Sequence, residues 1–527
     1  MASKPKNKSD MVFVIRPSEF GEFLPFPEMA LTAYLKQEGF KVSIVDPMPL
    51  IKKAITISDP LFDKYFDYVK KEIIRLKPRF IGLGTFTSDY DFIMHFAERI
   101  KEYSDAKIIV GNVHATVMPK DFVFKGSPVD FSVIGEGELT LVEILSRKPL
   151  TPSYLEKIDG ICFYDAENDK AVETKRRGLM PDLSKLPVPA YDAIDMSYYI
   201  RPVKRVIGYA HYVVVPVYSG RGCPFRCKFC AAGSVWGQRL MRPLPIDNVI
   251  KEIKYLIKKY NIDAVYVIDD TFTINKARVL EFCEKVKPLN IVWAAQTRVN
   301  LIDDEMVRIM RDSGCTQLTL GVETGSQKLL DLMKKDTTVE QIREAFAICK
   351  KYKMRTLANM MFNLPGETKK DVQASYDLFE EINPDEFGLG LTVAYPGTDI
   401  YDEYFPHKLD KDEYYLLAEA RGVGKGRFRL CKHDLDFEEL LVDFRMNLKI
   451  QHLFPLFIRI LINKEYLVMI KNSKYRDQYV HAILKDLPVG LMRTAGVLAY
   501  NLVRMFPAGL RRPFVKLAID LGKKYGN

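Results

Sequence analysis

Long uncharged apolar runs are missing from this sequence. None reaches the length of about 18 residues that indicates a membrane-spanning helix, so the chain is not expected to cross a bilayer. Its start, MASKPKNKSD, is polar and lacks the apolar core of a secretory signal peptide. Together these two absences predict a cytoplasmic protein.

Cysteine is also scarce. Eight cysteines in 527 residues are too few for a disulfide scaffold. Five of them are scattered in apolar or helical contexts, which is typical of small buried side chains: Cys162, Cys283, Cys315, Cys349 and Cys431. The other three lie within eight residues of one another, at positions 223, 227 and 230, and this contrast makes them the first candidates for chemistry.

Most of the chain carries almost no net charge. Residues 451–527 contain 13 Lys or Arg against 4 Asp or Glu, a net +9 out of a total of +10, so nothing in the first 450 residues indicates nucleic-acid binding. The basic tail also contains apolar segments, such as 487–510, that suit a membrane interface rather than its interior. We expect residues 451–527 to contact the inner face of the membrane, and a helical lid is the alternative.

The first part of the chain alternates apolar, β-branched runs with amphipathic helical patterns. This alternation predicts a parallel, doubly wound, Rossmann-like α/β domain over residues 1–149, whose ligands bind beyond the carboxyl ends of the strands. Strands are expected at 11–17, 41–46, 80–86, 106–112 and 129–138, and helices at 28–39, 67–77 and 92–103. Residues 150–205 are rich in proline and charge and are expected to connect two domains, with one hairpin near 160–172.

A second alternating series occupies residues 206–400. Its six β-then-α units predict a partial (β/α)6 barrel, in which chemistry gathers at the carboxyl ends of the strands. The strands are expected at 212–219, 264–270, 291–298, 317–323, 356–367 and 386–398. Residues 401–527 form the predicted C-terminal helical, basic region.

The three neighbouring cysteines have the spacing Cys223-x3-Cys227-x2-Cys230, within GRGCPFRCKFCAAG. Three thiolates this close bind three irons of a [4Fe–4S] cubane and leave the fourth iron open to another ligand. A zinc knuckle is the alternative, but it needs a fourth Cys or His, and none lies between positions 212 and 282. The motif therefore predicts an iron–sulfur cluster.

This motif follows a predicted strand and has Phe229 before its last cysteine, and it resembles the radical S-adenosylmethionine (SAM) superfamily. The resemblance implies that SAM binds the open iron and is cleaved to a 5′-deoxyadenosyl radical after one electron arrives from a donor such as flavodoxin or ferredoxin. It also implies a set of SAM-binding residues, mostly at successive strand ends: Phe229, Asp269, Asp270, Arg298, Glu323, Gly366 and Tyr395.

The domain ahead of the barrel contains GNVHATVMP and VIGEGE, and it is similar to the cobalamin-binding radical SAM group. This group includes methylases of unactivated carbons and the anaerobic Mg-protoporphyrin monomethyl ester cyclase. The resemblance implies cobalamin contacts from Ser18, Thr85, Ser88, Gly111, Asn112, His114, Gly135 and Glu136. The motif Asp-x-His-x-x-Gly, which supplies a cobalt-ligating histidine, is absent, so His114 is not expected to ligate cobalt.

The leading functional interpretation is a cobalamin-dependent C-methyltransferase. Its substrate is expected to be a hydrophobic small molecule, because aromatic residues are frequent between positions 414 and 444. A tetrapyrrole cyclase-type oxidation without methyl transfer is the alternative within the same fold. A non-catalytic cobalamin-binding sensor is the alternative from another functional class. The sequence names no catalytic residue beyond those that bind the cofactors.

Overall fold

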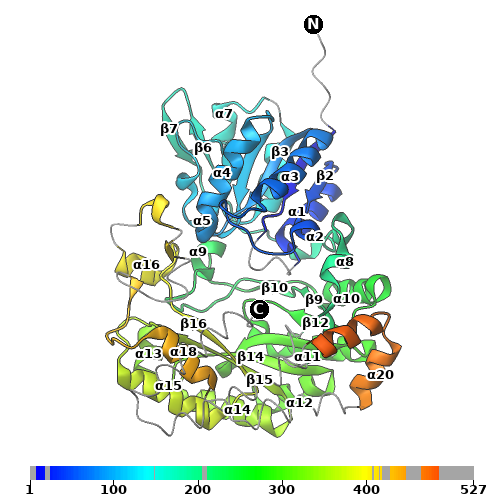
Figure 1. Ribbon diagram of the computed structural model, residues 1–527, viewed down its shortest axis with the longest axis vertical. Coiled ribbons are helices and arrows are strands. Elements are labelled where there is room, and N and C mark those ends of the chain that lie inside the picture. Colours follow the sequence, from blue (N-terminus) through cyan, green and yellow to red (C-terminus); the bar gives the residue numbers. More distant parts are fainter. Residues whose placement is uncertain are drawn as a thin grey trace. The chain divides into compact units, whose positions relative to one another are not determined.

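The computed structural model describes residues 8–17, 24–147, 149–203, 210–405, 409–414, 416–417, 428–446 and 464–485 (Figure 1). Ser18 and most of the basic tail therefore lie outside the described residues. The chain divides into two compact units. The first unit comprises residues 1–199, 222–248 and 394–419, and the second unit comprises residues 200–221, 249–393 and 420–527. In the described part of the chain, no helix is both long and apolar enough to cross a membrane.

A seven-stranded sheet forms the centre of the first unit, in the order β2-β1-β3-β4-β5-β6-β7. Its first five strands run parallel, which confirms the doubly wound arrangement that the alternation predicts. The strand order reverses between β1 and β3, where such sheets bind ligands. The strands are β1 (Ser9–Val14), β2 (Val42–Val45), β3 (Pro78–Gly84), β4 (Lys107–Gly111), β5 (Phe131–Val133), β6 (Ile161–Asp165) and β7 (Lys170–Glu173).

The hairpin predicted near residues 160–172 is present as β6 and β7, and it extends this sheet. β6 pairs antiparallel with β5, with Phe131 opposite Phe163, and β7 forms the edge. Part of the segment expected only to connect two domains thus completes the sheet of the first. The hairpin was visible in the sequence as a local turn pattern, whereas its partner strand is set by tertiary packing.

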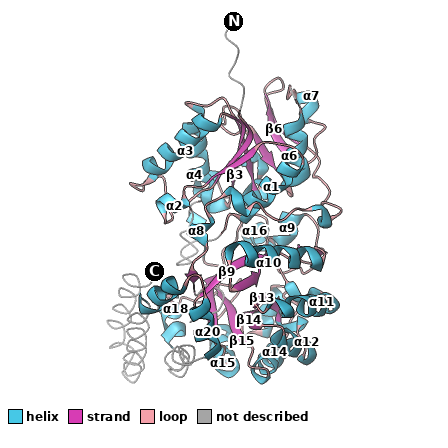
Figure 2. Ribbon diagram, turned by 90° about the vertical axis from the view of Figure 1, so that its right-hand side faces the viewer, coloured by secondary structure: helices cyan, strands magenta, loops and turns pink. Residues whose placement is uncertain are grey.

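Helices cover both faces of the first sheet, with α3 and α4 on one face and α1 and α6 on the other (Figure 2). Side chains from six strands, β1 to β6, and from α1, α6 and α7 form one apolar core, which includes Met11, Phe13, Leu35, Phe80 and Ile144. The helices of this unit are α1 (Phe26–Gln37), α2 (Met48–Ile51), α3 (Phe62–Leu76), α4 (Tyr90–Lys101), α5 (Asn112–Val117), α6 (Gly137–Ser146), α7 (Pro152–Leu155), α8 (Met196–Tyr199), α9 (Ala232–Trp236) and α16 (Asp399–Tyr404).

The second unit contains a sheet in the order β16-β15-β14-β13-β12-β9-β8. Six of its strands are parallel and follow one another along the chain, which confirms the partial barrel. The short β8 (Pro202–Val203) pairs antiparallel with β9. The parallel strands are β9 (Tyr212–Val217), β12 (Ala264–Val267), β13 (Val292–Arg298), β14 (Cys315–Glu323), β15 (Arg355–Phe362) and β16 (Glu386–Leu391), and the two-residue strands β10 (Gly220–Arg221) and β11 (Arg242–Pro243) flank the cysteine loop.

The barrel helices begin at the caps that their sequences encode. Asn275, Asp303, Thr338 and Thr368 each accept a hydrogen bond from a backbone N–H of the first turn that follows. Thr338 and Thr368 form complete capping boxes with the residue three positions later. The helices are α10 (Ile246–Tyr260), α11 (Lys276–Val286), α12 (Asp304–Asp312), α13 (Gln327–Leu332), α14 (Val339–Lys351) and α15 (Lys369–Ile382).

The described part of the tail packs on the barrel through tyrosines. α18 (Phe437–Met446) and α20 (Lys464–Asn472) are helical, as predicted. The Tyr466 hydroxyl accepts from the His211 N–H and donates to its carbonyl, both at 3.0 Å, and the Tyr479 hydroxyl accepts from Val213 N–H at 3.0 Å. Both contacts lie where β9 begins. α20 and the segment around Tyr479 therefore lie at the end of the barrel where its strands begin, opposite the end where chemistry gathers.

Candidate functional site

The cysteine loop opens on a glycine that no other residue could replace without strain. Gly222 has φ +89°, and a Cβ there would lie 2.2 Å from the carbonyl oxygen of Leu240, which brings the two ends of the loop together. Across the loop, Arg239 Nη1 donates to the carbonyl of Phe225 at 2.7 Å. Of the three cysteines, Cys223 is half-buried, Cys227 is buried and Cys230 is exposed. The loop thus presents three thiols from a closed, braced backbone.

Two arginines fasten the segment after the cysteines to the rest of the first unit. Arg176 donates to the carbonyls of Ser234 and Val235, at 2.8 and 2.5 Å, at the end of α9. Arg242 forms a bidentate ion pair with Glu136, at 2.8 and 3.1 Å. Only 13 % of the Arg242 side chain and 8 % of the Glu136 side chain are exposed. A well-shielded, bidentate pair of this kind fixes geometry as well as contributing energy.

Glu136 was predicted to contact cobalamin, and the structure places both of its carboxylate oxygens in this ion pair. Its Oε2 also accepts from the N–H of Met180 at 2.7 Å. Since Glu136 immediately precedes α6 and comes shortly after β5, the ion pair joins the strand ends of the doubly wound sheet to the segment that carries the cysteines. Within the first unit, the two predicted cofactor regions are therefore mechanically connected.

A polar cavity of about 420 Å³ lies in the same unit. It is lined by residues 116–118 at the end of α5, by Arg176, by α9 together with Gly237, and by Gly397 and two residues of α16. Gly397 has φ +86° and belongs to the turn that follows Tyr395, whose carbonyl accepts from the Thr398 N–H at 3.2 Å. Tyr395 and Phe229 are both half-buried. The cavity therefore adjoins elements from both predicted cofactor regions.

The strand ends of the first unit carry small neutral side chains that hydrogen-bond to backbone. The buried Thr85 donates through Oγ1 to the carbonyl of Gly111 at 2.8 Å, which ties the end of β3 to that of β4. A Cβ on Gly111 would meet nothing within 4 Å, so a ligand could approach the backbone there. Asn112 has φ +78°, and Gly135 has φ +81°. Ser88 is exposed beside these ends, and its hydroxyl donates to Asp89 at 3.1 Å.

His114 lies entirely inside the first unit, with no exposed surface. Its Nδ1 is 3.0 Å from the hydroxyl of Thr87, and its Nε2 is 3.3 Å from Asp121 Oδ2. The rings of Tyr414 and Phe122 contact its edges, with centroids at 4.8 and 5.4 Å. Both ring nitrogens thus face protein groups, which agrees with the expectation that His114 does not ligate cobalt.

In the second unit, Asp269 organises the turn that precedes the cysteine loop. Its carboxylate accepts from the backbone N–H groups of Ser219 and Gly220, at 2.6 and 3.2 Å, and from the Ser219 hydroxyl. Burial raises the pKa of Asp269 to about 6, although these hydrogen bonds oppose the shift. Asp270, the next residue, is exposed. Of this acidic pair, Asp270 is therefore the better placed to meet a ligand.

Arg298 and Glu323 converge on a lysine that the sequence analysis did not single out. The Lys335 ammonium lies 2.5 Å from Glu323 Oε1, and the Arg298 guanidinium donates to the carbonyl of Lys335. Exposure of all three residues is 8 % or less. Glu323 has φ +66°, and a Cβ on Gly321 would fall 2.6 Å from both charged groups of the pair, so this ion pair requires the glycine.

The turn after β15 binds a distant segment of the chain. The buried Asn363 has φ +62°, and its Nδ2 donates to the carbonyls of Thr392 and Phe428, at 2.9 and 3.0 Å. The N–H of Gly366 donates to the carbonyl of Leu430 at 3.2 Å. The turn that carries Gly366, which is predicted to bind SAM, is thus hydrogen-bonded on both sides.

Family models match both regions of the chain. The model of the radical SAM superfamily matches residues 217–379, and that of the B12 binding domain matches residues 21–145. The chain thus contains the two domains that the cobalamin-binding radical SAM enzymes combine. The cofactors of this family are a [4Fe–4S] cluster, SAM and cobalamin. The three neighbouring cysteines and the small-residue strand ends described above fit the cluster and cobalamin.

Several curated proteins resemble this enzyme over most of their length. An uncharacterized methyltransferase of Pyrococcus horikoshii is 28 % identical over 71 % of this chain and 77 % of its own. The anaerobic magnesium-protoporphyrin IX monomethyl ester cyclase of Rubrivivax gelatinosus is 27 % identical, over 71 % of this chain and 65 % of its own. The cytidylyl-2-hydroxyethylphosphonate methyltransferase of Streptomyces wedmorensis is 24 % identical, over 67 % of this chain and 72 % of its own.

Solved structures confirm the fold. The radical SAM methyltransferase TsrM from Kitasatospora setae, with cobalamin and a [4Fe–4S] cluster bound, superposes with a TM-score of 0.61 at 17 % identity and covers 76 % of this chain and 75 % of its own. The cobalamin-dependent enzyme OxsB superposes with a TM-score of 0.59 at 19 % identity, over 81 % of this chain and 58 % of its own.

Proposed function

We propose that this enzyme methylates an unactivated carbon of a hydrophobic small molecule. One observation carries the proposal: the bidentate Glu136–Arg242 ion pair joins the strand ends of the cobalamin-binding domain to the cysteine segment within one compact unit. An enzyme that moves a methyl group from one cofactor to a radical made with the other needs both cofactors held in a fixed geometry. A sensor that only binds cobalamin has no need of such a link.

The residues divide the work by chemistry. Cys223, Cys227 and Cys230 bind the cluster, and Gly222 and Arg239 keep their loop closed. When bound, the cluster and SAM supply the substrate radical, and cobalamin supplies the methyl group. Further cobalamin contacts come from the neutral strand ends around Gly111.

In the second unit, the charged strand ends receive the charged groups of SAM. The Arg298 guanidinium and the Glu323–Lys335 pair orient the carboxylate and the amino group, and Asp270 offers a further acceptor for the ammonium. Asp269 is a positioning residue: its carboxylate holds the Ser219–Gly220 turn and does not itself contact SAM. Gly366 supports the adenine through its backbone.

Phe86 adds an apolar contact that the sequence analysis missed. It follows Thr85 at the end of β3, and 48 % of its surface is exposed. We assign it to packing against the corrin ring, since a large exposed aromatic side chain among ligand-facing strand ends marks a binding surface. Its position between two threonines in Thr85-Phe86-Thr87 was the only available sequence signal.

The deciding experiment uses full-length enzyme reconstituted anaerobically with iron, sulfide and hydroxocobalamin, then incubated with SAM and a reductant. Formation of both S-adenosylhomocysteine and 5′-deoxyadenosine supports the methylase. Deoxyadenosine alone favours the cyclase-type oxidation. This reaction is the second candidate because the chain resembles the Rubrivivax cyclase. If neither product forms in enzyme that has bound both metal cofactors, the proposal is wrong and the sensor remains.

An electron donor of the flavodoxin or ferredoxin type completes the proposed reaction, because SAM cleavage consumes one electron. Reduction of the cluster by photoreduced flavodoxin, followed by its electron paramagnetic resonance signal, tests this partner. A cluster that dithionite reduces and flavodoxin leaves oxidised would exclude flavodoxin as the donor.

Peripheral binding to anionic membranes is the remaining part of the proposal. The described tail helices expose Leu467, Val468, Val480 and Leu484, which are 45 to 61 % exposed, beside the exposed Lys471. Apolar side chains next to lysines suit a lipid interface. Binding to sedimenting liposomes should rise with anionic lipid, fall with salt, and weaken when the four apolar residues are changed to serine. Enzyme that stays in the supernatant at low salt would exclude the membrane contact.

A further inference from the structure

Three side chains with metal-binding atoms meet beyond the end of β15. Glu367 follows that strand, and Cys431 and His433 come from the segment between Phe428 and α18. One ligand atom from each lies within 4.8 Å of the other two. Glu367 and His433 are buried, and Cys431 is half-buried. None of the three has a role in the proposed radical chemistry.

One oxygen of the buried Glu367 lacks a partner. Its Oε2 accepts from the N–H of Asn363 at 2.8 Å and lies 3.2 Å from His433 Nε2. Its Oε1 is buried and has no hydrogen-bond partner in the part of the chain that the structure describes. A bound cation would satisfy the unpartnered oxygen.

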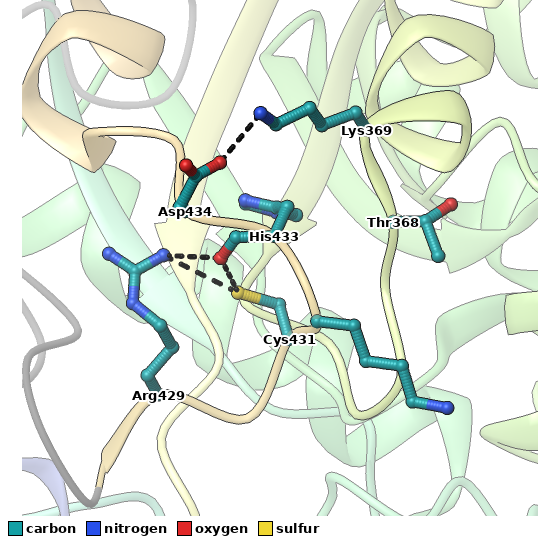
Figure 3. A pocket seen from close by; sticks show the side chains of 7 residues that line it. Thr368, Lys369, Arg429, Cys431, His433 and Asp434 are labelled. Carbon is teal, nitrogen blue, oxygen red and sulfur yellow. Dashed lines mark hydrogen bonds and ion pairs between the residues drawn. The ribbon is translucent and has the colours of Figure 1, made fainter.

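The thiol of Cys431 has a cation beside it. Arg429 Nη1 lies 3.7 Å from Cys431 Sγ, so a positive charge stands beside the atom that would bind a metal. Arg429 also donates to the carbonyl of His433 at 2.9 Å and lies over the ring of Phe437, 4.5 Å from its centroid. Figure 3 shows Arg429, Cys431 and His433 converging in this way. The arginine therefore orders the loop that carries two of the donors.

We propose that Glu367, Cys431 and His433 bind one zinc ion. Thiolate, imidazole and carboxylate form a donor set typical of zinc, and the two anionic ligands neutralise its charge. Tetrahedral bonds of about 2.0 to 2.3 Å place ligand atoms about 3.3 to 3.8 Å apart, so the present set, whose atoms lie within 4.8 Å of one another, needs to close by about 1.5 Å at most. The fourth position takes water from the adjoining cavity of about 590 Å³, which Cys431 and His433 line.

Zinc binding has one local cost and one local consequence. His433 Nδ1 accepts a long hydrogen bond, 3.3 Å, from the N–H of Leu435. When Nε2 of the neutral imidazole binds zinc, Nδ1 carries the proton, so this hydrogen bond is lost. In return, the ion fastens the segment after Phe428 to the turn of β15, beside the bond from Gly366 N–H to the Leu430 carbonyl. Zinc would thus stiffen the turn assigned to adenine.

The test counts metals in full-length holoenzyme. Enzyme with a reconstituted cluster is equilibrated with zinc sulfate, passed through metal-free gel filtration and analysed by plasma mass spectrometry. We expect about one zinc beside the about four irons of one cubane. Glu367→Gln and Cys431→Ser should each lose the zinc and keep the iron. Two matched controls should keep both metals: Cys349→Ser removes another buried thiol of the second unit, and Lys432→Ala removes a cavity-lining side chain.

X-ray absorption at the zinc edge identifies the site without any substitution. One sulfur and three nitrogen or oxygen ligands are expected in the wild-type holoenzyme, and three or four sulfurs would assign the zinc to the cluster cysteines. That result, a zinc-free wild-type enzyme, or zinc retained by both ligand variants would overturn the site. The buried Glu367–His433 pair would then be a structural ion pair alone. A failed methylase assay leaves this zinc count unaffected.

Discussion

The strand ends of the two units differ in the kind of polar group they carry. In the first unit, β3 and β4 end in neutral groups, the Thr85 hydroxyl and the backbone of Gly111, and Gly111 borders open space. In the second unit, the strand ends carry the charged Asp269, Arg298 and Glu323, all nearly buried. Both sets end parallel strands, so topology alone does not decide the chemistry. A neutral, open edge suits a large cofactor held by many weak contacts, and a buried, charged edge suits a small zwitterion such as SAM.

The largest expected effect concerns the loop that carries the three motif cysteines. Changing Cys223, Cys227 or Cys230 to alanine should reduce the iron content from about four per chain to near zero, because three thiolates hold the cubane. Iron and sulfide analysis after anaerobic reconstitution measures this. Cys283→Ala and Cys315→Ala are the matched controls, since both remove buried thiols far from the motif in sequence. If a control variant loses the cluster while the motif variants keep it, the assignment is wrong.

The charged edge should be the next most sensitive. Arg298→Ala and Glu323→Ala should slow SAM cleavage by about a hundredfold or more while keeping the cluster, since each removes charge-assisted hydrogen bonds from a shielded site. Single-turnover formation of 5′-deoxyadenosine is the measurement.

A paired variant separates binding from folding at this edge. Breaking a buried ion pair from one side costs about 3 to 5 kcal/mol of stability. Glu323→Gln combined with Lys335→Met removes both charges and should restore much of that stability without restoring SAM cleavage. Normal cleavage in the double variant would show that these charges have a structural role only. The charged strand ends of the second unit would then not be a SAM-binding site.

Asp269 should give the charged edge a measurable pH dependence. Its pKa of about 6 in the folded protein lies above the unfolded value of about 3.9. The folded state therefore binds more protons between these values, and stability falls as pH rises from about 4 to 6, then stays level. The shift corresponds to about 3 kcal/mol. Asp269→Asn should remove this fall.

Denaturant unfolding followed by tryptophan fluorescence measures the effect. The chain has two tryptophans, and the buried Trp293 of β13 reports on the second unit once Trp236 is changed to phenylalanine. Equal pH dependence in this background with and without Asp269→Asn would show that other groups dominate.

The smallest effect is expected at the neutral edge. His114→Ala should leave the cobalt spectrum of bound cobalamin unchanged, because both nitrogens of His114 face Thr87 and Asp121 inside the unit. About one equivalent of cobalamin should remain after gel filtration. A shifted spectrum would mean that His114 reaches cobalt and that the first unit does contribute an ionisable ligand.

Sequence patterns predicted the features that are local. The alternation of strands and helices identified both sheets, and the cysteine motif was visible because its members lie within eight residues. The predicted contacts of the site residues with their cofactors remain predictions. The partner of Glu323 was not visible, because Lys335 is twelve residues away in a loop and only the fold brings its ammonium back.

The same limit explains the Glu367, Cys431 and His433 set. Cys431 was interpreted as a small buried side chain, because a single cysteine carries no spacing pattern. Its relation to Glu367, 64 positions earlier, depends on how the chain returns to β15. Sequence reasoning therefore finds sites that one loop supplies and misses sites that two distant segments supply.

The tyrosines of the tail bear on how this protein can be shortened in the laboratory. The hydroxyls of Tyr466, Tyr475 and Tyr479 contact backbone groups of His211, Tyr260 and Val213, respectively. A chain that stops after α18 would lack the three tyrosines. The backbone groups of His211, Tyr260 and Val213 would then lose these hydrogen-bond partners. A truncated protein that keeps residues up to 485 retains these contacts, whereas a shorter one would have a weakened barrel.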